Sequence, residues 1–203
     1  MKMKDNYPTQ EYLHTCFMYD SITGDLIWKE RPVEHFANTR TWKRWNNMFS
    51  GKVAGYINKA KDSDTLHYKT ITLDNKIRKA HVLVWIMAYG SRVKLIDHID
   101  MDGTNNRLDN LRELTVSKNA RKCKPLKSNK SGYKGVCART DSSKWYVSLK
   151  VNGKTKSLGS YDDIVYASKV YSTAVLILEG EVFSESEPFD INSEDYKNVL
   201  NKL

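Results

Sequence analysis

The stretch from Leu95 to Lys122 constrains this chain more than any other. It opens with an apolar run that closes on Asp97 and His98, and a polar loop rich in Asp, Asn and Gly follows. A short apolar segment then carries Asn110, and the stretch ends on a predicted helix that carries Asn119. A carboxylate, an imidazole and a distant amide on a strand–loop–helix unit are the parts of a one-metal phosphodiesterase site.

The residue types in this stretch suit that chemistry. Asp97 offers a hard oxygen ligand for Mg²⁺ or Mn²⁺, and an amide oxygen on the following helix can add a neutral contact. His98 can take a proton from water near neutral pH. On a regular strand Asp97 and His98 point to opposite faces, unless a bulge or twist turns both toward one cleft.

Two other interpretations of the polar loop compete with a phosphodiesterase site. Its Asp-Met-Asp-Gly piece resembles part of a calcium-binding loop, but in that register the first ligand position falls on His98 and the apolar position on Asn105. A loop held by structural Asx turns is the stronger alternative, and the residues alone leave it open.

The positive charge is concentrated in one block. The formal net charge is +9. Ser117 to Leu158 contains twelve Lys or Arg and one acid, whereas Gly159 to Leu203 contains three Lys and nine acids. A basic block that begins on the predicted Asn119 helix favours a polyanionic partner, most often nucleic acid.

Cysteine use and hydropathy predict the compartment. The three cysteines, Cys16, Cys123 and Cys137, lie far apart and form no CxxC pair, which argues against a zinc ribbon. An odd count without a signal peptide favours a reducing interior. The longest apolar run, Val82 to Ala88, is too short to cross a bilayer. We therefore expect a cytoplasmic protein, in the host cell if a phage encodes it, with no membrane partner.

Periodicity and turn residues predict the elements. Helices are expected over Thr9–Cys16, His81–Tyr89, Asp163–Leu178 and Ser193–Leu200, and a hairpin over Phe17–Lys29. Strands are expected within 51–79 around an Asp74-Asn75-Lys76 turn, and three more within 133–161, with Asn152-Gly153 as a two-residue hairpin turn. Glu30 to Ser50 is expected to be less regular, with Trp42 and Trp45 more often packed than touching nucleic acid.

The pieces HVLVWIMAYG, DHIDMDGTNNRLDNLR and SKNARK, spread over Ala80 to Lys122, resemble the HNH homing-endonuclease family with its ββα-metal fold. The resemblance implies His98 as general base, Asp97 and Asn119 as metal ligands, and Asn110 as the residue that braces the loop and positions the site. Asn119 replaces the final His, a His-Asn-Asn variant expected to bind metal more weakly. His81 falls where relatives often have His, and a phosphate contact and a structural role stay equally open. The pieces TGDLIWK and WKRWNN resemble, more weakly, the leading segment of phage-type HNH proteins.

The segment from Ser131 to Gly180 resembles the Apetala-two-type DNA-binding domain through its YKGV, KWYVSL and KSLGSY pieces and the helix that follows. The resemblance implies a three-stranded sheet laid into the major groove of duplex DNA and braced by one helix. Trp145 is equally open as a core residue, and Cys137 stands where many relatives carry a second Arg. Across both modules the predicted DNA contacts are Arg107, Arg121, Lys122, Lys134, Arg139, Lys144, Trp145, Lys150, Lys154 and Lys156.

These expectations combine into an α+β protein with a ββα-metal nuclease core and a small three-stranded antiparallel sheet with one packed helix. The predicted segments are an N-terminal accessory segment (1–50), the nuclease domain (51–122), a basic linker (123–130), the DNA-binding domain (131–185) and a C-terminal tail (186–203). The predicted function is site-specific hydrolysis of duplex DNA with one divalent metal, Mg²⁺ or Mn²⁺. A non-catalytic DNA-binding regulator is the main alternative, and an RNA-binding protein is a third. Because nothing marks a dimer seam, a monomer is expected.

Overall fold

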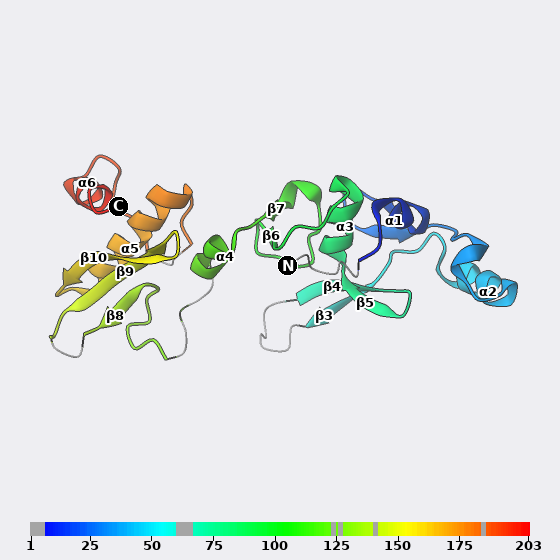
Figure 1. Ribbon diagram of the computed structural model, residues 1–203, viewed down its shortest axis with the longest axis horizontal. Coiled ribbons are helices and arrows are strands. Elements are labelled where there is room, and N and C mark those ends of the chain that lie inside the picture. The colour runs from blue at the N-terminus through cyan, green and yellow to red at the C-terminus, as the bar shows by residue number, and fades with distance from the viewer. Residues whose placement is uncertain (1–6, 60–66, 123–124, 126–127, 140–141, 184–185) are drawn as a thin grey trace. The chain divides into compact units, whose positions relative to one another are not determined.

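The computed structural model describes residues 7–59, 67–122, 125, 128–139, 142–183 and 186–203. The chain divides into two units, Met1–Leu114 and Thr115–Leu203, and each is described by itself (Figure 1). Both units mix helix and antiparallel sheet, which confirms the predicted α+β class. None of the helices in the described part of the chain is long and apolar enough to cross a membrane.

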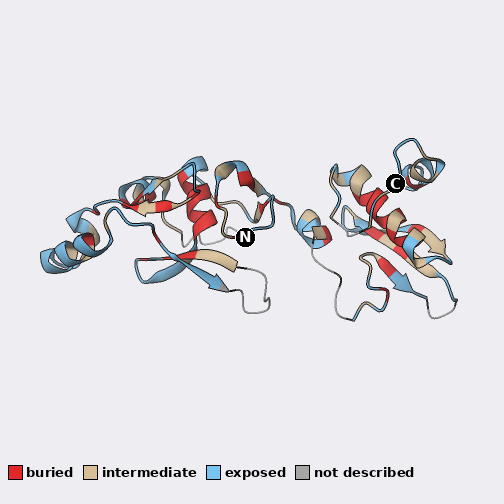
Figure 2. Cartoon of the chain, turned by 180° about the vertical axis from the view of Figure 1, so that it is seen from behind, coloured by how far each residue is buried: buried red, intermediate tan, exposed pale blue. Residues whose placement is uncertain are grey.

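The first unit is built around one buried helix, α3. Its elements are α1 (Gln10–Cys16), β1 (Phe17–Tyr19), β2 (Leu26–Trp28), a 3-10 turn η1 (Val33–His35), α2 (Thr39–Phe49), β3 (Tyr56–Lys59), β4 (His67–Leu73), β5 (Lys76–Lys79), α3 (Ala80–Tyr89), β6 (Ile96–His98), a 3-10 turn η2 (Leu108–Asn110) and β7 (Leu111–Glu113). The residues of α3 from Ala80 to Met87 are all buried, and Gly90 ends the helix with φ +74° (Figure 2). A helix that is apolar on every side must be covered on every side, and α1, β4 and β5 all contact it.

The N-terminal elements share that core rather than forming a separate segment. Leu13, Phe17 and Leu26 are buried in the same cluster as Leu83 of α3. Residues 1–50 and the nuclease elements therefore lie in one unit, which differs from the predicted boundary at residue 50. Thr9 caps α1 as predicted, by accepting a hydrogen bond from the Tyr12 amide.

The prediction that residues 30–50 are irregular is wrong for α2. The Asn38 side chain accepts a hydrogen bond from the Thr41 amide and begins an eleven-residue helix. Trp45 packs edge-on against Trp28 with ring centroids 4.8 Å apart, so this tryptophan serves the core as predicted. Trp42, Trp45 and Phe49 recur at three- and four-residue spacing, which is the local signal of this helix.

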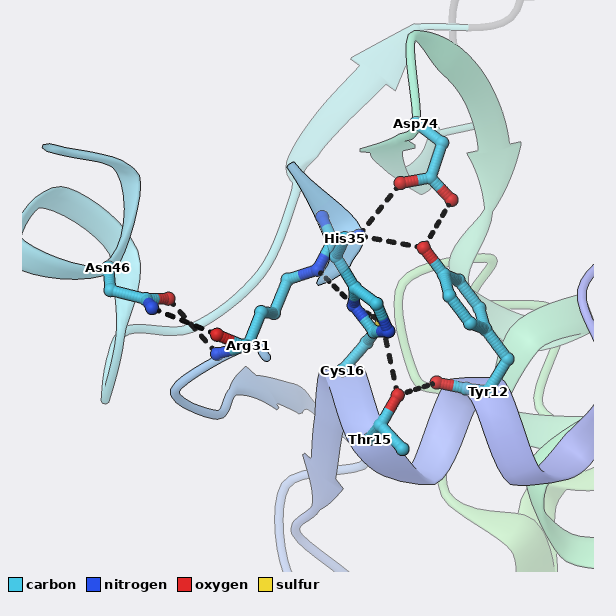
Figure 3. A network of polar contacts seen from close by, with 7 residues as sticks. All are labelled: Tyr12, Thr15, Cys16, Arg31, His35, Asn46 and Asp74. Carbon is cyan, nitrogen blue, oxygen red and sulfur yellow. Dashed lines mark hydrogen bonds and ion pairs between the residues drawn. The ribbon is translucent and has the colours of Figure 1, made fainter. Parts of the chain in front are cut away.

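Arg31 ties α2, α1 and the β4–β5 turn together (Figure 3). Its side chain is only 4% exposed, and its Nη2 donates to the Tyr12 hydroxyl at 2.7 Å and to Asp74 Oδ1 at 2.8 Å. Its Nε donates to His35 Nδ1 at 3.2 Å. The Tyr12 hydroxyl in turn donates to Asp74 Oδ2 at 2.7 Å. A buried guanidinium is costly unless its donors find acceptors, and this network supplies acceptors for Nε and Nη2.

The second unit is a three-stranded sheet covered by one long helix. Its elements are α4 (Val116–Lys122), β8 (Val136–Ala138), β9 (Trp145–Val151), β10 (Lys154–Tyr161), α5 (Ile164–Glu179) and α6 (Glu194–Leu200). The strand order is β10-β9-β8, all antiparallel. Asn152 and Gly153 both have positive φ, as a type I′ turn requires, and the predicted hairpin is confirmed.

The core of this unit lies between α5 and one face of the sheet. Val147 and Leu149 of β9 pack with Val170 and Ala174 of α5. Asp163 caps α5, and Gly180 ends it. Ala167, Val170, Tyr171 and Ala174 are buried along one side of the helix, whereas Leu178 near its end is exposed. Val199 of α6 belongs to the same cluster, so the predicted tail 186–203 contributes to this core.

Helix α4 belongs to the second unit by its contacts. Lys118 Nζ lies 3.3 Å from Glu179 Oε2, and Arg121 is ion-paired with the same carboxylate. The Arg121 Nη2 also donates to the Lys150 carbonyl at 2.7 Å. The boundary between the units therefore precedes α4, whereas the predicted nuclease domain ended after it.

Candidate active site

The β6–β7 hairpin presents Asp97 and His98 in an unbroken register. Asp97 lies opposite Arg112 and His98 opposite Leu111, with no bulge between the pairs. Successive side chains therefore project to opposite faces, the first of the two arrangements that the sequence allowed. Asp97 Oδ2 accepts from Arg112 Nε at 3.1 Å, and the Asp97 side chain is 14% exposed.

His98 faces the interior of the unit, where its ring is 5% exposed. The ring meets His81 of α3 edge to face, with centroids 4.9 Å apart, and Tyr68 of β4 lies 6.2 Å away. His98 Nε2 lies 3.1 Å from Asn106 Oδ1. Since an amide oxygen only accepts, this contact holds the proton on Nε2 and the basic lone pair on Nδ1.

His81 is a neutral neighbour of His98. The pKa of His81 is lowered to about 3, mainly by burial and to a smaller extent by the nearby His98 and Lys79. Burial also lowers the pKa of Lys79, whose ammonium lies 4.1 Å from the centre of the Tyr68 ring. Within the described part of the chain, His81 Nδ1 and Asn106 Nδ2 are buried without a hydrogen-bond partner. Two such polar atoms beside one imidazole are unusual for a purely structural cluster.

Asn110 joins the two ends of the polar loop. Its Oδ1 accepts from the Asp100 amide at 3.0 Å, and its Nδ2 donates to Asp100 Oδ1 and to the Asn105 carbonyl, both at 2.9 Å. Partial burial acts to raise the pKa of Asp100, but hydrogen bonds from Asn110, the Asp102 amide and Asn105 outweigh it and lower the pKa. These are the contacts that a loop-bracing residue would make, and they are consistent with the role that the family resemblance implies.

The loop between Asp100 and Asn106 is held by side chains that accept from amides two residues on. Asp100 accepts from the Asp102 amide, and Asp102 accepts from the Thr104 amide. The Asx-turn interpretation therefore describes this loop correctly. The loop is more than a connection, however, because Asn106 places its amide oxygen on His98.

Asn119, the other predicted metal ligand, lies on α4 in the second unit. Because the two units are described separately, its role as a ligand beside Asp97 stays a prediction. Among the described residues, no group of three or more His, Cys, Asp or Glu side chains is placed to hold a metal ion. Asp97 still suits Mg²⁺ or Mn²⁺, because a carboxylate can share its two oxygens and Mg²⁺ keeps several waters.

The strand register sorts the predicted DNA contacts of the second unit onto two faces. Lys150 and Arg139 fit the open face: Lys150 alternates with the buried Leu149, and Arg139 follows Cys137, which pairs with Tyr146 on that face. The residues that line a hollow beside β8 include the predicted contacts Lys134 and Arg139, together with Lys130 and Cys137.

Three predicted contacts lie on the helix-covered side instead. Lys154 pairs with Val151 and Lys156 with Leu149, so both start from the core face, and Lys156 Nζ donates to the Leu203 carbonyl. Trp145 packs against the core, which favours the core role that the sequence left open. All three residues therefore leave the backbone on the face of the sheet opposite to Lys150.

Four further predicted contacts differ in setting. Arg121 is buried and engaged by Glu179 and the Lys150 carbonyl, so a phosphate contact would cost it that ion pair. The exposed Arg107 is paired with Asp109 at 2.7 Å, and the exposed Lys144 with Asp162 at 3.3 Å. Exposed pairs of this kind are weak and can open onto a phosphate. Lys122 is partly exposed at the end of α4.

Comparison with known proteins places the site in a family. A family model described as HNH endonuclease matches residues 78–121, which begins on β5 and includes His98, Asn110 and Asn119. The chain is also 34% identical over 100 residues to Protein 3.8 of Escherichia phage T7, covering 48% of this chain and 83% of that protein. The chain carries an HNH endonuclease domain and belongs to the same family as Protein 3.8. No solved structure matches it.

The HNH domain contains two neighbours of His98 that sequence reasoning did not assign to the site. Asn106 lies in the polar loop, and the sequence carried no signal that its side chain would contact His98. His81 was left between a phosphate contact and a structural role. The structure shows it buried against His98, a contact that no local pattern encodes because the two residues lie on different elements.

Proposed function

We propose that this protein is a metal-dependent endonuclease that hydrolyses phosphodiester bonds in duplex DNA, with His98 as the general base. The observation that supports it most directly is the setting of His98. The imidazole is buried at the end of β6, and Asn106 holds its Nε2 at 3.1 Å, which orients Nδ1 as the basic atom. A buried imidazole whose orientation is fixed by a hydrogen bond is suited to activating water against a phosphate.

Asp97 and Asn119 are the proposed metal ligands in this scheme. A bound Mg²⁺ or Mn²⁺ would supply charge stabilisation at the phosphate and at the leaving oxygen. Arg112 on the neighbouring strand donates to Asp97 Oδ2 and fixes the direction of the carboxylate. Asn110 fixes the loop that carries Asn106, so it positions His98 indirectly.

The second unit is proposed to bind the duplex as an Apetala-two-type module, with a homing type of site recognition. The open sheet face carries Lys150 and Arg139, and Lys130 and Lys134 line the hollow beside β8 together with Arg139. A three-stranded sheet with cations on its open face fits the major groove of DNA. Host cytoplasm is the corresponding place of action, and a monomer is the proposed state.

Cleavage of supercoiled plasmid tests the enzyme against its main rival, a DNA-binding regulator. Wild type should nick or linearise plasmid with Mg²⁺ or Mn²⁺ and stop when EDTA is added. His98→Ala should lose cleavage by at least 100-fold while duplex affinity stays within about twofold. His14→Gln, an exposed histidine on α1, is the matched control and should cut like wild type. Normal cleavage by His98→Ala would refute the assignment of the base, and DNA binding by wild type without any metal-dependent cutting would favour the regulator.

A further inference from the structure

Helix α2 presents a basic face that the nuclease site does not use. Arg40, Lys43, Arg44 and Asn47 are all exposed, and their spacing of three and four residues places them along one side of the helix. Thr39–Phe49 contains no Asp or Glu. Within the described part of the chain, none of the three cations has an ion-pair or hydrogen-bond partner for its side chain. The charge on this face is therefore not compensated locally.

The opposite face fixes the helix firmly to the first unit. Asn46 is buried, with its Nδ2 donating to the Arg31 carbonyl and its Oδ1 accepting from the Arg31 amide, both at 3.0 Å. Trp42 Nε1 donates to the same carbonyl at 2.7 Å. Trp45 packs against Trp28. Three hydrogen bonds to one residue and an aromatic contact hold α2 in a defined orientation, and a fixed helix loses little entropy when a ligand binds its outer face.

We propose that the Arg40–Lys43–Arg44 face of α2 is a second DNA-contact surface, one that binds the phosphate backbone of the duplex independently of base sequence. This inference rests on the proposed function, because it takes the substrate to be duplex DNA. The four residues from Arg40 to Asn47 span about 10 Å along the helix axis. That length matches about three phosphates of one strand at 3.4 Å of axial rise each.

The position of α2 in the first unit gives this contact a purpose. α2 and the β6–β7 hairpin lie at opposite ends of the unit, with α1 and α3 between them (Figure 1). Cations there would touch the backbone away from the scissile phosphate. Contacts of that kind set orientation and affinity rather than sequence. The unit that carries His98 would therefore hold DNA by itself, in addition to the sheet of the second unit.

The salt dependence of DNA binding tests this surface directly. Affinity of the full chain for a short duplex is measured by fluorescence anisotropy between 50 and 200 mM KCl, in EDTA so that nothing is cut. The triple variant Arg40→Gln, Lys43→Gln, Arg44→Gln should bind more weakly, with a log–log salt slope shallower by about 2.7 if each cation meets one phosphate. The charge-preserving variant Arg40→Lys, Arg44→Lys should keep the wild-type slope.

A charge-matched control removes three lysines from the acidic C-terminal part, through Lys169→Gln, Lys197→Gln and Lys202→Gln, and should change the slope by less than one. Far-UV circular dichroism and melting temperature show that each variant is folded. If the α2 variant shifts the slope no more than this control, the inference is wrong. Binding of the same variants to anionic phospholipid vesicles is measured in parallel. If the α2 substitutions weaken vesicle binding and leave DNA binding unchanged, the inference is also wrong. If the wild-type protein has no affinity for DNA, the proposed function is wrong as well. If the wild-type protein binds DNA and the α2 substitutions have no effect, only the inference about α2 is wrong.

Discussion

Replacing His81 by Phe should change how the stability of the first unit depends on pH. In the folded chain burial lowers the pKa of His81 to about 3, whereas an unfolded histidine titrates near 6.5. Between these values the unfolded chain binds a proton that the folded chain does not, so stability is lost as pH falls below about 6.5. The slope approaches about 1.4 kcal/mol per pH unit, and the loss from pH 7 to pH 5 is about 2 kcal/mol.

Phe at position 81 removes the titrating group and the unpartnered Nδ1 while keeping an aromatic ring against His98. The variant should therefore lack about 2 kcal/mol of the acid-induced destabilisation that wild type shows between pH 7 and pH 5. Urea unfolding at pH 7, 6 and 5, followed by tryptophan fluorescence, measures it. In a Trp145→Phe background the four remaining tryptophans of five all precede Leu114 and report on the first unit.

His67→Gln on β4 serves as the control, because it also removes one histidine from the first unit. This control should keep the full difference between pH 7 and pH 5. If His81→Phe and wild type lose the same stability on acidification, His81 is not held neutral in the folded chain, and our account of the His98 environment fails.

Two further substitutions test the packing of each unit by urea unfolding. Arg31→Met should destabilise the first unit by about 2–3 kcal/mol. This is less than the loss expected for a fully buried ion pair, because Asp74 is 44% exposed and water can replace the lost donor. A loss under 0.5 kcal/mol would show that the Arg31 network does not stabilise the unit. Gly135→Ala should destabilise the second unit by about 2–4 kcal/mol, because φ is +71° and an added Cβ would lie 2.0 Å from the Tyr171 ring. Gly132→Ala, with similar φ but open space, should cost only about 1 kcal/mol, and equal costs at the two sites would show that the ring contact is unimportant.

Local patterns predicted the elements whose signals are local. α3 and α5 follow from apolar spacing and end at glycines, and the Asn152-Gly153 turn follows from its residue types. α2 was missed although Trp42, Trp45 and Phe49 recur at helical spacing after the Asn38 cap. Its contacts to Arg31 and Trp28 lie outside the helix, so the local pattern could not predict them.

One feature of the second unit could have been read from the sequence and was not. A two-residue turn at Asn152-Gly153 fixes Lys154 opposite Val151, and alternation then places Lys156 opposite Leu149. Since Val151 and Leu149 are apolar, the Cα–Cβ bonds of both lysines were bound to be on the core side of the sheet. The predicted DNA contacts included Lys150, Lys154 and Lys156 together, although alternation along the strands places Lys150 on one face of the sheet and the other two lysines on the opposite face.

The alternation of β6 likewise explains how two adjacent residues can take different chemical roles. His98 faces the interior of the unit, where its ring meets the ring of His81, a histidine whose pKa is lowered by burial. Asp97 faces the other side of the hairpin, where Arg112 Nε donates to its Oδ2. The proposed general base and the proposed metal ligand therefore have different surroundings, although they are adjacent in the sequence. One residue step along a regular strand places the imidazole in the interior and the carboxylate beside a cation.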